Sequence, residues 1–238
     1  MSEADRHELP SSWVWSVFDT FGTFTGGGTP SKDRPEFWTN GNIPWVSPKD
    51  MKSFEIHQTE DYITEDAVAE SATTVVPSES VLMVTRSGIL RHTFPVAIAR
   101  VAVALNQDLK ALAPHEGVHP DYVAYALQAF GQSIIHACSK DGTTVQSIDA
   151  LALKRFQLPL APMFEQRRIT DVLDELFSDL DAGVAALERI RAKLKLYRTS
   201  VLKAAVEGTL TADWRERYSN TEPASELLRR ILAERRRR

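Results

Sequence analysis

The last third of this sequence repeats apolar residues at alternating spacings of three and four, a pattern typical of a helix that pairs with another helix. The repeat follows Glu165-Gln-Arg-Arg, no proline interrupts it before Glu207, and Gly208 supplies a C-terminal stop. We predict one long helix over 165–207, locally weakened at Gly183. Its helix-pairing seam comprises Ile169, Leu173, Leu176, Leu180, Leu187, Ile190, Leu194, Tyr197 and Val201. The chain therefore contains one half of a two-helix rod, and another chain or segment must supply the second helix.

The composition is that of one globular domain plus this helix. The chain has 238 residues, of which 43% are hydrophobic, and a formal net charge of −4. Its single cysteine, Cys138, excludes an internal disulfide and fits a reducing compartment. No apolar run approaches the roughly 20 residues that span a bilayer, and the N-terminal residues lack the apolar core of a secretory signal. We expect a cytoplasmic protein without membrane contact.

Charge is distributed unevenly along the chain. Residues 1–160 hold 12 Lys and Arg against 19 Asp and Glu, a net −7, whereas residues 161–238 hold 16 against 13, a net +3. A net-negative domain argues against loose, non-specific binding of nucleic acid, which needs excess positive charge. A local basic face is still possible, because residues 83–107 contain three arginines and no acidic residue. The acidic residues of segment 55–70 are interpreted as a solvated face away from any nucleic acid.

The pattern of the first 160 residues predicts a mixed α/β (α+β) domain. Residues 13–18, 80–85 and 95–104 are rich in Val, Ile and aromatic residues and favour strands. Residues 121–137 have the apolar spacing of an amphipathic helix opened by Pro120. The four tryptophans at positions 13, 15, 38 and 45 are expected to pack in the core rather than to stack on bases.

Prolines and glycines divide the chain into segments. The prolines at 159 and 162 keep residues 158–162 extended, and we place the main boundary there. The prediction is a globular domain over 1–160, the long helix within 161–210, and a tail over 211–238 with a short amphipathic helix. The tail ends abruptly in four arginines, which keeps open the interpretation that the chain is a piece of a longer protein. Residues 26–31 are predicted as a loop and residues 141–143 as a turn.

Two segments resemble catalytic motifs only by their letters. His115-Glu-Gly-Val-His119 matches a zinc-protease pattern, which requires a helix that places both imidazoles on one face. Pro114, Gly117 and Pro120 oppose a helix there. The three glycines at 26–28 lack the Gly-Lys-Ser/Thr of a phosphate-binding loop. We therefore predict a non-catalytic chain that binds no metal.

Several short motifs, taken in order, resemble the specificity subunit of type I restriction–modification systems. A seven-residue repeat directly after Glu-Gln-Arg-Arg makes the resemblance specific, although each motif alone is weak. The motifs are Leu9-Pro-Ser-Ser-Trp-Val-Trp, Gly28-Thr-Pro-Ser, Phe37-Trp, Gly41-Asn-Ile-Pro-Trp-Val-Ser-Pro-Lys-Asp-Met51, Asn106-Gln-Asp, Gly142-Thr-Thr, and Leu158-Pro-Leu-Ala-Pro-Met-Phe-Glu-Gln-Arg-Arg168.

The resemblance implies a division of labour. The globular domain would be a target recognition domain that reads one half of a bipartite sequence in double-stranded DNA, and the helix would dock methyltransferase subunits. Methylation and cleavage would belong to a methyltransferase subunit and a restriction/translocase subunit, which would bind S-adenosylmethionine, ATP and Mg. Members of this family usually contain two domain–helix units with antiparallel helices, whereas this chain has one. The partner helix comes either from a second copy of the chain or from the missing second half of a specificity subunit. The alternative is a degenerate or truncated coiled-coil interaction protein without DNA-reading activity.

The candidate DNA contacts are polar and cationic residues in the loops, since side chains with fixed donors and acceptors read base edges and cations bind phosphates. Arg86 and Arg91 are alternatively solvated charges or partners in internal ion pairs. The pattern does not separate base contacts from phosphate contacts. The candidates are Ser31, Lys32, Arg34, Ser47, Lys49, Lys52, Thr85, Arg86, Ser87, Arg91, His92, Lys140, Thr143 and Thr144.

Overall fold

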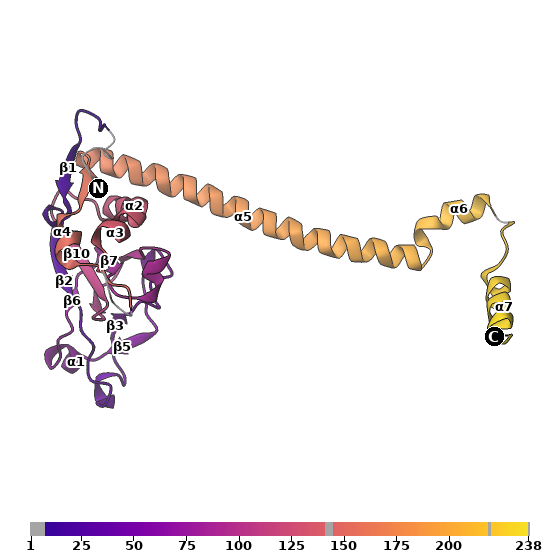
Figure 1. The fold of residues 1–238 in the computed structure, drawn as a ribbon, viewed down its shortest axis with the longest axis horizontal. Coiled ribbons are helices and arrows are strands. Elements are labelled where there is room, and N and C mark those ends of the chain that lie inside the picture. Colours follow the sequence, from indigo (N-terminus) through magenta and orange to yellow (C-terminus); the bar gives the residue numbers. More distant parts are fainter. Residues whose placement is uncertain (1–7, 141–144, 219, 238) are drawn as a thin grey trace. The chain divides into compact units, whose positions relative to one another are not determined.

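A five-stranded sheet forms the centre of the globular part in the computed structural model, which describes residues 8–140, 145–218 and 220–237. The strand order is β2-β10-β7-β8-β4, and all neighbours are antiparallel except the parallel pair β4 and β8. Figure 1 shows the helices α2 (Pro120–Ala129) and α3 (Gly131–Cys138) beside this sheet. The strands span Gly22–Gly26 (β2), Leu109–Pro114 (β10), Ser80–Val84 (β7), Val96–Ala99 (β8) and Glu55–Ile56 (β4).

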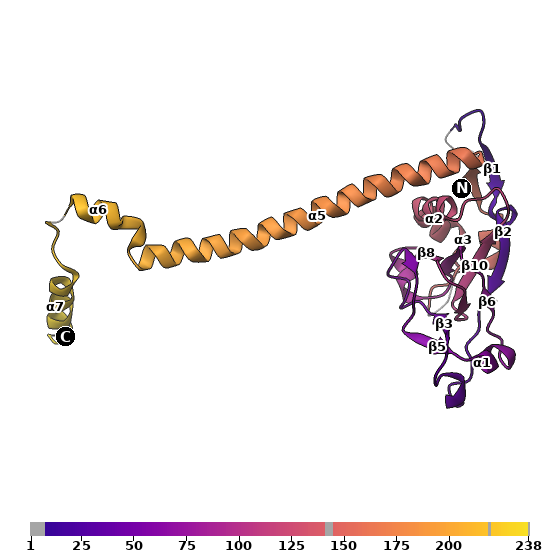
Figure 2. The same cartoon turned by 180° about the vertical axis from the view of Figure 1, so that it is seen from behind.

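Two smaller sheets complete the globular part. The four-stranded sheet has the order β5-β3-β9-β6, and the two-stranded sheet pairs β1 with β11. Figure 2 shows β3, β5 and β6 toward the same end of the globular part as the short helix α1 (Glu65–Ala69). The strands span Asp61–Ile63 (β5), Ile43–Val46 (β3), Val103–Leu105 (β9), Val75–Val76 (β6), Val14–Val17 (β1) and Gln157–Leu160 (β11).

Alternation along β7 builds the core on both faces of the central sheet. Successive side chains of a strand point to opposite faces. Val81 and Met83 join one apolar cluster with the helices, whereas Leu82 and Val84 join another that includes residues of β9. A strand buried on both faces is almost continuously apolar, which is why residues 80–85 were recognisable as a strand.

Two predicted elements are each divided in the structure. Residues 95–104 form β8 and β9, which belong to different sheets, because the chain turns at Arg100. Residues 121–137 form two helices that meet at Phe130, so that Leu127 and Ile134 both reach the same core cluster. The short helices are α1 (Glu65–Ala69), α2 (Pro120–Ala129), α3 (Gly131–Cys138), α4 (Ala150–Arg155) and the 3-10 turns η2 (Phe18–Thr20), η3 (Pro35–Phe37) and η4 (Gly88–Arg91).

The predicted glycine loop is present over residues 27–31, whereas Gly26 ends β2, and close packing explains two of its glycines. A Cβ atom on Gly27 would lie 2.3 Å from the Leu105 carbonyl oxygen, and one on Gly28 would lie 2.6 Å from the Ala72 carbonyl carbon. Backbone therefore passes backbone at this point. The predicted turn at 141–143 lies outside the described residues.

The predicted long helix is confirmed as α5 (Met163–Val206), whose 44 residues correspond to about 66 Å. Gly208 ends it with a left-handed backbone, φ 78°. The chain divides into two compact units, 1–174 and 175–238. The first turns of α5 thus pack with the globular part. The second unit also contains η5 (Thr209–Thr211), α6 (Ala212–Arg217) and α7 (Ala224–Arg235). Within the described ranges, no helix is both long and apolar enough to cross a membrane.

Candidate nucleic-acid interface

Two of the predicted loops lie side by side. After β7, Thr85 and Ser87 follow the backbone of residues 146–148: Ile148 N–H donates to Thr85 O over 2.8 Å, and Ser87 N–H donates to Gln146 O over 3.1 Å. Lys140 N–H reaches Ser147 O from the other side, over 2.9 Å. The structure therefore brings the region around Thr85 next to the region around Lys140. Thr143 and Thr144 lie outside the described residues.

An open cleft of about 770 Å³ adjoins the place where these two regions meet, and it is called the cleft from here on. Loop 48–54, loop 87–95 and the ends of α2 and α3 form its walls. Of the predicted contacts, Lys52 and Ser87 line it, exposed His92 precedes the lining residue Thr93, and exposed Arg91 lies two residues from both Ile89 and Thr93. Its apolar lining includes Met51, Phe54, Phe94 and Val96, and its polar lining comprises Lys52, Ser53, Ser87, Thr93, Gln128 and Gln132.

Sequence reasoning missed Ser53, Thr93, Gln128 and Gln132. The two glutamines lie near the junction between α2 and α3, which the sequence pattern had presented as one continuous helix. Gln132 Nε2 also donates to the carbonyl oxygen of His92 over 2.9 Å and so ties α3 to the loop after η4. Glutamine is one of the few side chains that can both donate to and accept from a base edge.

Ion pairs separate the predicted cations into two groups. Lys49 Nζ lies 2.8 Å from Glu60 and 3.0 Å from Asp61, and these hydrogen bonds, the one to Glu60 first, raise the pKa of Lys49. Lys52 and Lys32 have no ion pair within 4.0 Å among the described residues, and the same holds for Arg91. The paired group comprises Arg34 with Glu36 and Glu70, Lys49 with Glu60 and Asp61, Arg86 with Asp108, and Lys140 with Asp149.

The acidic segment 55–70 is mostly exposed to solvent, as expected, but it also forms ion pairs that the sequence did not reveal. Its carboxylates are the partners of several cations: Glu70 binds Arg34, Glu60 binds Lys49, and Glu55 binds Arg100. These partners are distant in sequence, so a local charge pattern does not reveal them. The segment neutralises two cations that the sequence offered for phosphate binding.

Some predicted contacts serve the fold of the loops. Ser47 is buried and donates from Oγ to Asp50 over 2.8 Å, and buried Thr85 donates from Oγ1 to the carbonyl oxygen of Asp108. Ser87 Oγ accepts from Ile89 N–H at the start of η4, and Ser31 Oγ accepts from Asp33 N–H. These hydrogen bonds order the backbone of the loops that carry Lys32, Lys52 and Arg91.

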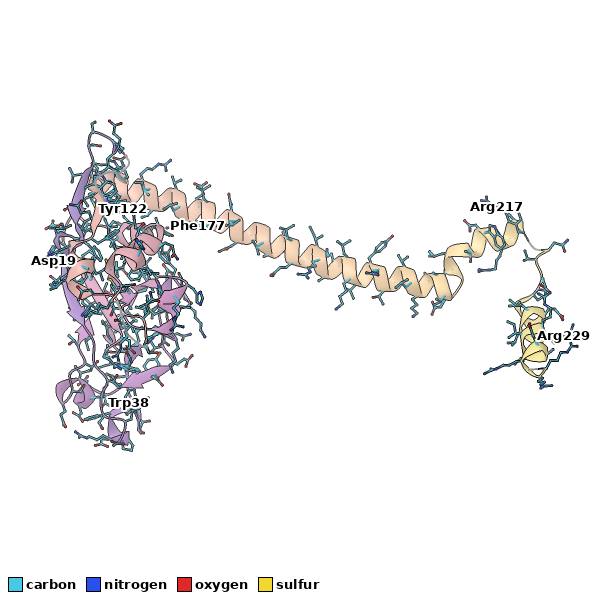
Figure 3. All side chains as sticks on the ribbon, viewed as in Figure 1. Asp19, Trp38, Tyr122, Phe177, Arg217 and Arg229 are labelled. Atoms are coloured by element: carbon cyan, nitrogen blue, oxygen red, sulfur yellow. The ribbon has the colours of Figure 1, made fainter. Side chains whose placement is uncertain are left out.

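Lys32 does not line the cleft. It lines a small pocket of about 380 Å³ with Pro35, Trp38, Thr39 and Asp61. Trp38 lies at the end of the globular part away from Tyr122, as Figure 3 shows. Trp38 packs edge-on against Trp45 at 5.2 Å between ring centroids, as expected for a tryptophan that packs in the domain.

The histidine pair at 115 and 119 lies in a turn. Val118 N–H donates to His115 O over 3.0 Å, Gly117 has φ 87°, and α2 begins only at Pro120. The prediction that this segment is not helical is confirmed. Among the residues with described positions, no group of three or more His, Cys, Asp or Glu side chains could hold a metal ion.

The family model for the type I restriction modification DNA specificity domain matches residues 10–189. The chain belongs to this family. It is 40% identical over 191 residues to the specificity subunit of type I restriction enzyme EcoR124I/EcoR124II from Escherichia coli, covering 79% of this chain and 47% of that protein. It is 30% identical over 198 residues to the MjaIX specificity subunit of Methanocaldococcus jannaschii, covering 81% and 45%. The resemblance inferred from the motifs is confirmed.

The mixed α/β fold with a long helix is also that of a solved specificity subunit. The crystal structure of the HsdS subunit from Thermoanaerobacter tengcongensis matches with a TM-score of 0.60 at 21% identity, over 84% of this chain and 46% of that one. The chain spans about half the length of the curated relatives it matches.

In this chain of the specificity family, the exposure of the seam residues differs along α5. Ile169 and Leu173 are half-buried, whereas Leu180, Leu187 and Leu194 are 60%, 67% and 62% exposed. Leucine side chains this exposed in one row form an apolar stripe along the helix. The remaining seam residues Leu176, Ile190 and Tyr197 are exposed as well, and Val201 is half-buried.

Proposed function

We propose that this chain is a DNA sequence-specificity subunit of a type I restriction–modification complex, which reads one half of a bipartite target. The observation that carries the proposal is the cleft, lined by Lys52, which has no ion pair with any residue of described position, in a chain whose long helix exposes an apolar seam. In this reading, Lys52 and Arg91 neutralise phosphates and set the register on the duplex. Gln128, together with the hydrogen-bonding groups of Ser87 and Gln132 that the bonds to Ile89 and His92 do not use, would contact base edges, and glutamine pairs well with adenine.

The seam would pair with an antiparallel helix of the same charge pattern. The first half of α5 is acidic and the second half basic, and the small residues 182–186 lie between them, near the helix midpoint. Antiparallel pairing about that midpoint places each acidic half beside a basic half. The first half carries Glu165, Asp171, Asp174, Glu175, Asp179 and Asp181 against Arg167 and Arg168, and the second half carries Arg189, Arg191, Lys193, Lys195, Arg198 and Lys203 against Glu188.

This pattern favours a second copy of the chain or a closely similar second half as the partner. A helix of about 66 Å can separate two recognition domains by about one to two turns of B-DNA, each roughly 34–36 Å. Two-fold pairing would present the domains to two half-sites with a fixed spacer between them. Insertion of four residues near Gly183 should then change the spacer length or abolish activity.

The chemistry would take place on other subunits. A methyltransferase subunit docked on the helix would bind S-adenosylmethionine, and a restriction/translocase subunit would use ATP and Mg. The chain itself would be non-catalytic and would act in the cytoplasm, where the DNA is. The alternative, a coiled-coil interaction protein that does not read DNA, accounts for the seam and leaves the cleft without a role.

Methylome sequencing separates the two functions. The chain is co-expressed with the methyltransferase subunit encoded beside it in a host without DNA methylation, and every methylated adenine or cytosine is mapped. The proposal expects one bipartite motif with a fixed spacer, which disappears when the chain is omitted. A stable complex of the two proteins with no methylated motif would instead support the interaction protein.

A further inference from the structure

The first three turns of α5 carry a polar stripe that the heptad pattern does not explain. Gln166 and Thr170 are the buried residues of α5, at 1% and 3% exposure, and Asp174 follows four residues later. Residues spaced by four lie on one face of a helix. From 3.6 residues per turn, this stripe lies roughly 90° around the helix from the seam. One face of the helix thus contacts the globular part while an adjacent face carries the seam.

Both the oxygen and the nitrogen of the Gln166 side-chain amide form hydrogen bonds in this contact. Its Oε1 accepts from the backbone N–H of His119 over 2.8 Å, and its Nε2 donates to the carbonyl oxygens of Gly117 and Ala161 over 3.1 and 2.8 Å. One side chain therefore joins the first turn of α5 to the turn before α2 and to the end of β11. Only an amide supplies an acceptor and two donors in this arrangement.

A second attachment lies two turns further along the helix. The hydroxyl of Tyr125, on α2, donates to Oδ1 of Asp174, and the Tyr125 ring stacks on Phe54 at 4.7 Å between centroids. Phe54 lines the cleft. Two fixed points about 12 Å apart along the axis define a direction, which one point cannot do.

We propose that Gln166 is a positioning residue, which together with the Tyr125–Asp174 hydrogen bond fixes the direction in which α5 leaves the recognition domain. This inference rests on the proposed function, because it makes the direction of the helix a determinant of the spacer between half-sites. A change of about 10° displaces a point roughly 60 Å along the helix by about 10 Å, or about three base pairs. A small loss of order at the attachment therefore becomes a large loss of spacer selectivity.

Spin-label distance measurements test the attachment without DNA. Cys138 is replaced by Ser, labels are placed at Thr23 on β2 and Glu188 on α5, and labelled chains are diluted with unlabelled ones so that distances come from one chain. Gln166→Leu keeps the volume and removes all three hydrogen bonds. We expect the distance distribution to broaden roughly twofold, because a small angular freedom is amplified along the helix. A distribution as narrow as that of the parent protein overturns the proposal.

Gln157→Leu is the matched control. Gln157 lies on β11 and its buried Oε1 has no hydrogen-bond partner among the described residues, so the substitution removes a glutamine without removing an attachment. It should leave the distribution unchanged; equal broadening by both variants would overturn the assignment to Gln166. Should Gln166→Leu not fold, Tyr125→Phe removes the hydroxyl and keeps the ring, and must also broaden the distribution.

The spacer supplies the functional readout in the methyltransferase complex. Parent and Gln166→Leu should methylate the same two half-sequences, but the variant should accept spacers one to three base pairs away from the parent length, about the displacement calculated above. An unchanged spacer would overturn the proposal. Absence of any bipartite motif with the parent protein would count against the proposed function instead, and the distance measurement would still decide whether Gln166 orders the helix.

Discussion

Lys49 and Lys52 lie three residues apart, yet only Lys49 is held by carboxylates, with Nζ 2.8 Å from Glu60 and 3.0 Å from Asp61. Lys52 lines the cleft and has no ion pair within 4.0 Å in the ranges that the structure describes. A lysine already paired with two carboxylates neutralises a phosphate poorly and so displaces few of the counterions condensed on DNA. An unpaired lysine can neutralise a phosphate and displace its counterion. The two residues are therefore a natural test pair for the interface.

Lys52→Ala should weaken binding to a duplex that carries the methylated motif and lower the slope of log K against log salt by about one. Lys49→Ala should leave that slope unchanged. Fluorescence anisotropy of a labelled duplex over a range of salt concentrations measures both. Equal slopes for the two variants would show that the cleft does not contact the phosphates.

Leu180→Lys together with Leu187→Lys should prevent assembly of the chain with its helix partner. Both leucines are more than half exposed in the single chain, and pairing would bury the introduced ammonium groups without counter-charges. Size-exclusion chromatography with light scattering measures the loss. The control is Ser178→Lys with Ala192→Lys, which adds the same charge on the opposite face of α5. If the leucine variant still assembles with a second copy and with the methyltransferase, the seam is assigned to the wrong residues.

The contrast between α5 and the interface explains what a sequence can reveal. The helix was predictable because seven-residue periodicity and Gly208 are local signals. The partners of Lys49 and Arg34 were not, because Glu60 and Glu70 approach only once β5 and α1 are folded. Gln166 was likewise recognised only as part of a motif, since its three partners belong to other segments. Periodicity predicts elements, whereas the contacts that form a site depend on how those elements meet.

Arg100→Met should destabilise the recognition domain by about 2–3 kcal/mol, somewhat less than a fully buried pair because its side chain remains 20% exposed. Its guanidinium binds Glu55, Glu79 and Asp121 at 2.5–2.6 Å, and the hydrogen bond from Arg100 holds the pKa of Glu55 below its ordinary value. Loss of the cation leaves these carboxylates close together without a counter-charge. Urea denaturation measures the change in the free energy of unfolding.

Arg34→Met provides the comparison for Arg100. Arg34 also binds two carboxylates, but its side chain is 42% exposed and solvent screens the pairs. Its loss should therefore be clearly smaller. A destabilisation as large as that of Arg100→Met would mean that burial does not determine the strength of these networks.

Asp149 should make the stability of the recognition domain depend on pH in the acid range. Its Oδ1 accepts from the N–H groups of Ala152 and Leu151 at the start of α4, over 2.8 and 2.9 Å, and these hydrogen bonds lower the pKa of Asp149 below its ordinary 3.8. A carboxylate whose pKa is lower in the folded state stabilises the fold fully at pH values above its unfolded pKa, and this contribution is lost as pH falls through its folded pKa.

Asp149→Asn keeps an oxygen that accepts the same bonds but does not titrate. Between about pH 5 and about pH 3, the urea midpoint should therefore fall further in the parent protein than in Asp149→Asn. In Asp149→Ala, which lacks the acceptor, the midpoint should lie below that of the parent at the higher pH, and this gap should narrow as the pH falls. A parallel decline of the parent and Asp149→Asn over this range would show that the capping carboxylate does not contribute to the acid sensitivity.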